Sequence, residues 1–357
     1  MNPQPRYSFE DRLALWSAQR ETEPVYFDEK VQKWRLLDYA TIARVLSDPA
    51  TFSSDFAGLA PVAVAGSSRV DLCSALAFPL PVMVISELLG IPAADREVFE
   101  KWAQILFSDD QLPESPTMEE IEAALAQIAP TIREMTGYIR GHIQHRREHP
   151  DDGLTSKLVA VEVGGERLED EEIIGFVALL LVAGHITTTA LIGNTALCLD
   201  RHPEAAAALR ADPGRLPTAL EEVLRCLPPF NELGRRTTTE VTLSGRVIPA
   251  DSVVAANLAS ANRDPAQFAY PDVFDISRSP NPHLSFGHGI HFCLGTPLAR
   301  LEGRVAFEEL FGRYQEIAIA ADEPVEFQNE AVIISVKKLI LEMSPAGGET
   351  SAVAARM

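Results

Sequence analysis

The stretch from Ile173 to Leu199, IIGFVALLLVAGHITTTALIGNTALCL, is the apolar segment that most limits the folds open to this chain. As a helix it is long enough to cross a bilayer. However, it contains His185, Asn194 and several threonines, and the segment before it is acidic rather than rich in Lys and Arg. A helix that is apolar on all sides can also form the centre of a large soluble protein. We therefore expect a buried central helix and no membrane span.

Length and composition narrow the class of protein. The 357 residues suffice for one large domain, and we expect a single domain over 1–343 followed by a disordered tail over 344–357. The formal charge of −20 repels phosphate backbones, so we expect no nucleic-acid partner. No secretory signal is visible, and the cysteines are too widely spaced for a disulfide framework or a zinc site, which favours a reducing cytoplasm. Three of them are expected to be small buried hydrophobes: Cys73, Cys198 and Cys226.

Periodicity predicts a mainly α protein with a small β subdomain. The predicted helices are DYATIARVLSD (38–48), Val82–Ser108, Met118–Arg147, the apolar segment, Arg215–Cys226 and LARLEGRVAFEELFGRY (298–314). The predicted strands are VYF and WRLL as a hairpin, VTLSGRVIP, SVVAANLAS and AVIISVKKLILEM, and residues 52–68 are predicted to form a loop.

Cys293 lies in FGHGIHFCLG, residues 286–295, immediately before a predicted helix. Free backbone N–H groups at a helix start can stabilise a thiolate. Gly287 and Gly289 allow a tight turn, and Gly295 allows a flat or bulky group to approach closely. The spacing does not fit the GxGxxG of a dinucleotide-binding loop.

The string Phe286-Gly-x-Gly-x-His-x-Cys293-x-Gly295 resembles the haem-ligating loop of cytochrome P450s. The resemblance implies a cytochrome P450-like fold and haem b, iron protoporphyrin IX, with Cys293 as the thiolate ligand of iron. It further implies that His291 and Arg235, the latter within GRRTTTEVTLSG, bind the haem propionates. A surface cation is the alternative for each.

Glu222-Val-Leu-Arg225 matches the ExxR pair of the same family. Residues three apart on a helix often form only a solvated ion pair. In the family the pair is a buried structural clasp behind the haem, and the resemblance implies that role here. ANRDPAQFAYPDVFDISR, before the cysteine loop, also resembles bacterial members.

Within the apolar segment, Ala183-Gly184-His185-Ile186-Thr187-Thr188 resembles the family's oxygen-activating motif. The resemblance implies that the two small residues leave room beside the iron and that Thr187 assists oxygen activation, which suits a local break in the helix. Packing or bonding to the preceding turn is the alternative for the threonines. Ile186 replaces the usual acid and can carry no proton. Impaired turnover, a relay through substrate or water, and peroxide-driven chemistry remain open; His185 faces another side and is not a substitute.

The sequence departs from the family pattern a second time after about residue 55. Family members carry several helices there, whereas this sequence has only FSSDFAGLAPVAVAGSS. Either the sequence omits residues or the form is truncated. The missing part normally supplies a cap over the substrate and part of the electron-donor docking face. Arg300 and Arg304 could help to dock an acidic ferredoxin, with ordinary surface charge as the equal alternative. The histidines of the helix 118–147 and just beyond it are expected to form a solvated face, not a metal site: His142, His145 and His149.

The resemblance as a whole implies a soluble, monomeric, cytoplasmic monooxygenase. It would insert one oxygen atom from O₂ into a C–H bond or alkene of a small hydrophobic, macrolide-like natural product of secondary metabolism. NAD(P)H would supply electrons through ferredoxin reductase and ferredoxin. The alternatives are a peroxide-dependent peroxygenase and a non-catalytic haem-binding or recruiting protein.

Overall fold

The computed structural model describes residues 25–28, 33–36, 68–106, 118–243, 245–327 and 333–345. The chain divides into two compact units, Met1–Leu59 and Ala60–Met357. In the first unit the described residues are the antiparallel strands β1 (Val25–Asp28) and β2 (Lys33–Leu36), as predicted. The predicted helix over 38–48 and nearly all of the predicted loop over 52–68 lie outside the described residues.

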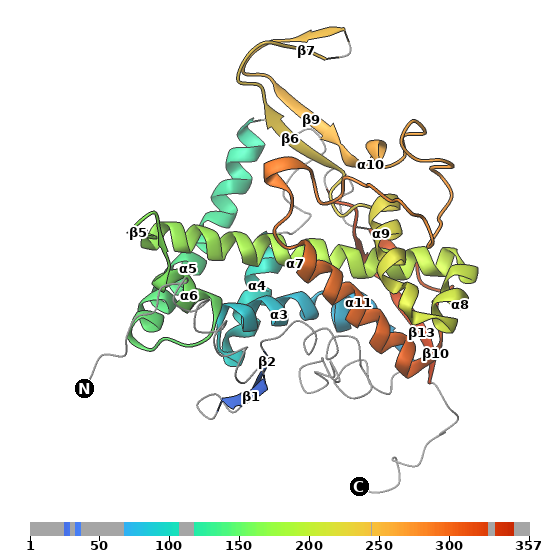
Figure 1. Cartoon of the computed structure of the whole chain (residues 1–357), viewed down its shortest axis with the longest axis horizontal. Helices are drawn as coiled ribbons and strands as arrows, with labels where there is room; N and C mark the ends of the chain where they lie inside the picture. Colours follow the sequence, from blue (N-terminus) through green and yellow to red (C-terminus); the bar gives the residue numbers. More distant parts are fainter. Residues whose placement is uncertain are drawn as a thin grey trace, which may run out of the picture. The chain divides into compact units, whose positions relative to one another are not determined.

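The second unit is mainly helical (Figure 1). Its helices are α3 (Pro79–Leu89), α4 (Arg96–Leu106), α5 (Met118–Glu148), α6 (Leu154–Ala160), α7 (Asp170–Arg201), α8 (Pro203–Ala211), α9 (Leu216–Cys226), α10 (Leu258–Ala261) and α11 (Thr296–Arg313). Short helical turns are η2 (Cys73–Ala77), η3 (Ala93–Asp95), η5 (Pro213–Arg215) and η6 (Gly289–His291). The helix predicted over 82–108 is therefore two helices. Gly90, left-handed at φ 74°, ends α3, because a residue without Cβ adopts that conformation at little cost.

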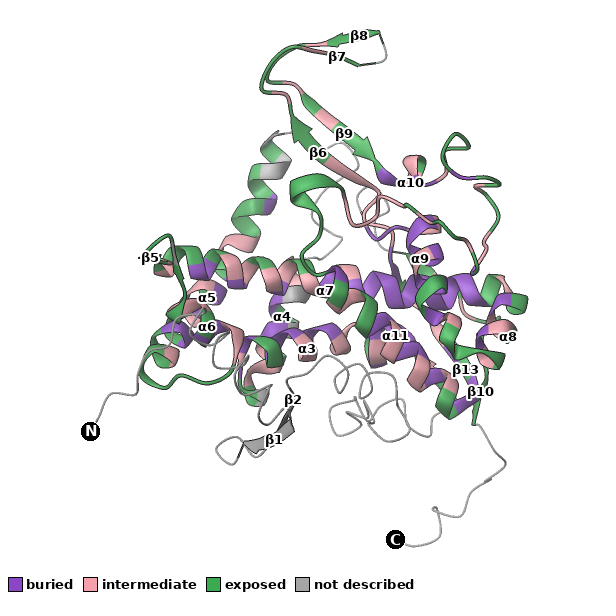
Figure 2. Ribbon diagram, viewed as in Figure 1, coloured by how far each residue is buried: buried purple, intermediate pink, exposed green. Residues whose placement is uncertain are grey.

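Helix α7 is the central helix of this unit. Asp170, Glu171 and Glu172 occupy its first turn, where the helix dipole favours negative charge, and Glu172 also accepts a hydrogen bond from the backbone N–H of Glu169 at 2.9 Å. Its second half, from Thr188 to Leu199, is buried throughout, as Figure 2 shows. The helix is apolar and long enough to cross a membrane, yet half of its most apolar window is covered by the rest of the protein. The expectation of a buried central helix is confirmed.

Two apolar clusters flank the two halves of α7. The first half packs with α3, α4 and α5 around Ile85, Trp102 and Ile139. The second half packs with α8, α11 and the C-terminal strands around Leu197, Phe307 and Leu341. Large side chains are buried on both sides of α7, and this burial stabilises its position. Each Å² of apolar surface removed from water contributes roughly 25 cal/mol.

The strands form small sheets. One sheet has the order β10 (Tyr314–Ile319), β13 (Ile340–Pro345), β3 (Arg69–Asp71), and all neighbouring strands are antiparallel. The remaining pairs are β4 (Glu162–Val163) with β5 (Glu166–Arg167), β6 (Glu232–Arg236) with β9 (Val253–Asn257), β7 (Val241–Leu243) with β8 (Arg246–Ile248), and β11 (Glu326–Phe327) with β12 (Val336–Lys338). The predicted mainly α architecture with a small β part is confirmed.

One predicted strand is shorter than expected. The alternation of SVVAANLAS predicts a strand to Ser260, but β9 ends at Asn257. The side chain of Asn257 accepts a hydrogen bond from the backbone N–H of Ser260 at 2.7 Å and caps α10. This N-cap contact competes with further strand pairing.

Candidate functional site

The cysteine loop is held by its own backbone. The N–H of Cys293 donates to the carbonyl of Phe286 at 2.9 Å, and the Thr296 hydroxyl, at the first residue of α11, donates to the Cys293 carbonyl at 2.8 Å. Gly287 and Gly289 both have φ of 75°, the left-handed conformation that their predicted tight turn requires. The sequence therefore folds locally as expected, with the thiol at the end of a closed loop.

The loop presents apolar side chains to its surroundings. Cys293 is exposed, and Ile290, Phe292 and Leu294 are 97%, 51% and 73% exposed. A Cβ at Gly295 would lie 3.8 Å from the Cys293 sulfur, so glycine keeps the surroundings of the thiol open. An exposed apolar patch around one thiol fits the face of a flat apolar group.

The donor atoms present fit haem iron. In the part of the chain that the structure describes, no group of three or more His, Cys, Asp or Glu side chains could hold a metal by itself. A single thiolate suits a metal whose other ligands belong to a cofactor, and haem iron with one cysteine ligand is such a case. The other cysteines cannot take this role readily, because burial raises the pKa of the Cys73 and Cys198 thiols to about 12.

The two predicted propionate partners, Arg235 and His291, are both exposed. Arg235 on β6 donates to the carbonyl of the adjacent Gly234 at 2.8 Å and has no carboxylate partner among the described residues, whereas the neighbouring Arg236 forms an ion pair with Asp251. Because successive strand residues point to opposite faces, the two arginines cannot serve the same site. His291 lies in η6, two residues before the cysteine. The pairing of Arg236 supports the choice of Arg235.

The oxygen-motif residues divide between two faces of α7. Ala183 is exposed and Gly184 and Thr187 are partly exposed, whereas His185 and Ile186 are buried. The Thr187 hydroxyl donates to the Ala183 carbonyl at 2.7 Å. The helix is continuous over this turn, so the local break that the motif suggested is absent from α7. The threonine instead makes the bond to the preceding turn that was the alternative.

His185 points away from Thr187. Its Nε2 lies 3.1 Å from the Phe78 carbonyl, and its ring meets the Phe78 ring edge-on with centroids 4.3 Å apart. Burial lowers the pKa of His185 to about 4, and the bond to the Phe78 carbonyl opposes that shift only in part. A neutral histidine on the opposite face agrees with the expectation that it does not replace the missing acid.

A single apolar cluster joins the cysteine loop to α7. Phe286 packs against buried residues that include Leu191 of α7 and Leu220 of α9. Leu191 follows Thr187 by one helical turn, and a Cβ on Gly303 of α11 would lie 3.3 Å from the Leu191 side chain. The cysteine loop and the helix that carries the oxygen-activating motif therefore pack against the same apolar cluster.

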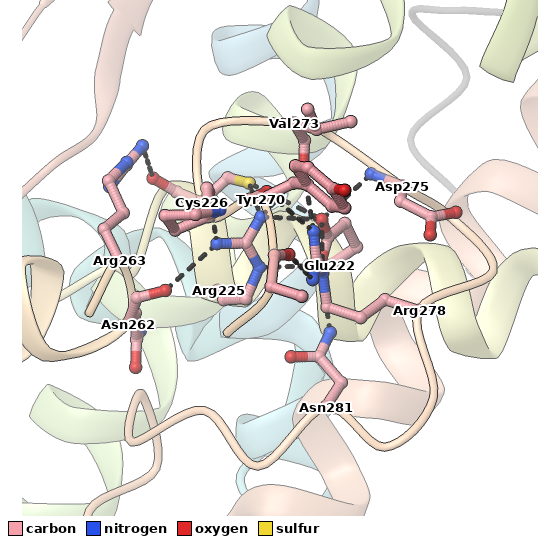
Figure 3. Close-up of polar contacts among 12 residues, drawn as sticks. Glu222, Arg225, Cys226, Asn262, Arg263, Tyr270, Val273, Asp275, Arg278 and Asn281 are labelled. Atoms are coloured by element: carbon pink, nitrogen blue, oxygen red, sulfur yellow. Dashed lines mark hydrogen bonds and ion pairs between the residues drawn. The ribbon is translucent and has the colours of Figure 1, made fainter. Parts of the chain in front are cut away.

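Glu222 and Arg225 of α9 form the predicted clasp (Figure 3). Both side chains are fully buried, and the guanidinium donates to the carboxylate at 2.7 and 2.8 Å. Arg225 also donates to the carbonyls of Asn262 at 3.0 Å and Pro271 at 2.7 Å. Burial by itself lowers the pKa of Arg225, but the hydrogen bond to Glu222 raises it, and the net result is a raised pKa. The solvated-pair alternative is wrong.

Two further residues of the clasp were not predicted from the sequence. Arg278 Nε donates to both oxygens of Glu222 at 3.2 Å, and the Asn281 amide donates to one of them at 3.0 Å (Figure 3). Arg278 ends the stretch ANRDPAQFAYPDVFDISR, so its only signal was the family-like segment itself. Nothing in the local sequence indicates that Arg278 contacts a carboxylate on α9.

The two proposed docking arginines already have carboxylate partners. Arg300 donates twice to Glu221, at 2.7 Å each, and Arg304 donates to Glu308 at 3.2 Å. Burial raises the pKa of Glu221, but the bonds from His283 and Arg300 outweigh it and lower the pKa to about 2. The positive charge that α11 offers to a partner is therefore partly neutralised.

The comparisons with known proteins match this arrangement. A family model described as Cytochrome P450 matches residues 96–343, which is more than half of the chain. The chain belongs to the cytochrome P450 family. It is an oxidoreductase and, like the hydroxylases and epoxidases it resembles, a haem-dependent monooxygenase.

Individual relatives are bacterial P450s. The chain is similar to the cyclomarin C epoxidase CymV of Salinispora arenicola, with 35% identity over 95% of this chain and 98% of that protein. It is similar to the erythromycin C-12 hydroxylase of Saccharopolyspora erythraea, with 38% identity over 94% of this chain and 95% of that protein. The solved structure of open cytochrome P450 EryK from S. erythraea gives a TM-score of 0.74 at 35% identity, covering 96% of this chain and 98% of that one.

The alignment lengths also bear on the missing helices. The alignment with CymV spans 394 positions, but 95% of this chain is only about 339 residues. About 55 positions of the relative therefore face gaps in this chain. This agrees with an internal segment that other members carry and this sequence lacks.

Proposed function

We propose that Cys293 would ligate haem b iron through its thiolate and that Arg235 and His291 would bind the haem propionates. The observation that carries this proposal is the exposed thiol in a closed glycine loop, surrounded by apolar side chains. Phe286, Gly287, Gly289 and Gly295 shape that loop. Bound haem supplies the redox chemistry that uses O₂, two electrons and two protons to place one oxygen atom in the substrate and the other in water.

The face of α7 that carries Ala183 and Gly184 would leave space for dioxygen and substrate when haem is bound. Side chains larger than these would occupy the volume that dioxygen and substrate need. The Thr187 hydroxyl carries a proton on this face; it donates to the Ala183 carbonyl here and could instead donate toward a bound substrate or water. Ile186 is buried and apolar, so it contributes no proton.

The substrate we propose is a small hydrophobic natural product of the macrolide-like kind. One relative is named as an erythromycin C-12 hydroxylase and another as a cyclomarin C epoxidase. Electrons would come from NAD(P)H through ferredoxin reductase and ferredoxin, and the protein would act as a cytoplasmic monomer. The negative charge of −20 gives no separate indication of a partner.

The second candidate function is a peroxide-dependent activity, because Ile186 replaces the usual acid. The third is a non-catalytic haem protein, which Ile186 and the missing segment together favour. Product formation with NADPH, ferredoxin and reductase supports the monooxygenase. Turnover only with hydrogen peroxide supports the peroxygenase, and haem binding with neither supports the third. Ile186→Glu separates them further, because restoring an acid should raise the ratio of product to NADPH consumed only in a monooxygenase.

The first test is the absorption spectrum of the full chain, reduced with dithionite under carbon monoxide. Thiolate-ligated haem gives a long-wavelength Soret band, and Cys293→Ala should lose it. Cys73→Ala, at a buried cysteine outside the cluster against which Phe286 packs, is the matched control and should keep it. Absence of haem from the unmodified chain would overturn the proposal.

A further inference from the structure

A small cavity lies among α3, α4, α5 and α7, on the side of α7 that faces away from Thr187. About 20 Å³ is available there to the centre of a water molecule. Val82, Phe99, Met135 and Leu181 supply apolar walls. Trp102 of α4 and His185 of α7 line the same cavity.

Both of these residues carry a buried polar atom without a partner. Trp102 and His185 are each only 2% exposed. Within the described part of the chain, neither Trp102 Nε1 nor His185 Nδ1 makes a hydrogen bond. An unsatisfied buried polar group costs about 1–3 kcal/mol, so two such groups around one cavity require an explanation.

The protonation of His185 follows from its other contact. Its Nε2 lies 3.1 Å from the Phe78 carbonyl, which can only accept, so Nε2 carries the hydrogen. Burial keeps the ring neutral, with a pKa of about 4. Nδ1 is therefore a lone-pair acceptor, whereas Trp102 Nε1–H is a donor.

We infer that the cavity binds one ordered water molecule that accepts from Trp102 Nε1–H and donates to His185 Nδ1. Water is the small ligand that supplies one acceptor and one donor at once. The space exceeds the roughly 10–15 Å³ that a buried water needs. The water links α4 to the turn of α7 that carries the oxygen motif. This inference does not depend on haem binding.

The test is water-contact NMR on the full chain with ¹⁵N-labelled tryptophan and histidine, in the diamagnetic ferrous–CO state if haem is bound. Trp102→Phe assigns the indole signal among those of the three tryptophans. We expect a nuclear Overhauser contact between the Trp102 indole hydrogen and a long-lived water, and a His185 Nδ1 shift typical of an unprotonated nitrogen. Absence of the water contact, or a proton on Nδ1, overturns the inference.

Variants at His185 test the acceptor. His185→Phe keeps a buried aromatic ring but removes the Nδ1 acceptor, and should shift the Trp102 indole ¹⁵N resonance and remove the water contact. Met135→Leu is the matched control, because it changes the cavity wall without changing a polar atom, and should leave both signals in place. Unchanged signals in His185→Phe would contradict the bridge. If that variant does not fold, the water contact of the unmodified chain decides.

Discussion

Arg225 Nη2 lies 2.7 Å from Glu222 Oε1, and neither side chain has any solvent exposure. The carboxylate receives further bonds from Arg278 and Asn281 (Figure 3). Each added partner compensates for part of the desolvation that burying the pair requires. This network joins α9 to the segment that leads into the cysteine loop, and it fixes where that loop begins.

Removing one member of this pair should unfold the protein readily. Arg225→Met leaves a buried carboxylate with less compensation, and breaking such a pair costs about 3–5 kcal/mol. Urea unfolding followed by circular dichroism measures the loss. Arg313→Met is the matched control, since its partner Glu309 is 45% exposed at the surface and the change should stay within about 0.5 kcal/mol. Equal stability of the two variants would refute the structural role of the clasp.

Two glycines of α7 should respond oppositely to alanine. A Cβ on Gly193 would overlap the side chain of Val336, whereas one on Gly175 meets no described atom within 4 Å. Gly193→Ala should therefore destabilise by about 1–3 kcal/mol through overpacking. Gly175→Ala should stabilise by up to about 1 kcal/mol through helix propensity. Thermal unfolding compares them, and a neutral Gly193→Ala would mean that β12 does not pack closely on α7.

Glu302 should make stability fall as pH rises. Burial in α11 raises its pKa from 4.5 to about 8, so between these values the folded state holds a proton that the unfolded state has lost. The free energy of unfolding then falls by up to about 1.4 kcal/mol per pH unit. His185 acts oppositely between pH 4 and 6.5, because its lowered pKa makes the unfolded state bind the extra proton.

The net fall should therefore be clearest between pH 6.5 and 8. Glu302→Gln removes the ionisable group with little change in volume, so its advantage over the unmodified protein should grow with pH from 4.5 to 8 and then level off. Urea unfolding across this range measures it. A constant difference between the two proteins would show that Glu302 is ionised in the folded state.

Arg235 and Arg236 should differ in haem retention. Arg235 has no carboxylate partner among the contacts described, whereas Arg236 is paired with Asp251. A hydrogen bond to a charged group is worth about 1.5–3 kcal/mol, so Arg235→Ala should weaken haem binding roughly 10- to 100-fold. Arg236→Ala should leave it unchanged. Haem transfer to apomyoglobin measures both, and equal losses would remove Arg235 from the proposed site.

Features that depend on neighbouring residues can be predicted from the amino-acid sequence of this chain. The apolar run made α7 a helix that must be buried, the glycines around Cys293 specified a tight loop before α11, and the spacing of Glu222 and Arg225 placed both on one helix face. Each follows from periodicity, turn preference or helix geometry, which are local properties of the chain. The replacement of the family's usual acid by Ile186 was also visible in the sequence.

The contacts between residues far apart in sequence depend on how the helices and strands pack. This packing brought Arg278 to Glu222 and Arg300 to Glu221, and it turned His185 and Ile186 inward while Ala183 remained exposed. The packing of α11 also leaves Glu302 only 5% exposed, although a glutamate on a helix is ordinarily solvated. These outcomes depend on which helices pack together, and packing partners far apart in sequence leave no periodic trace in the residues themselves.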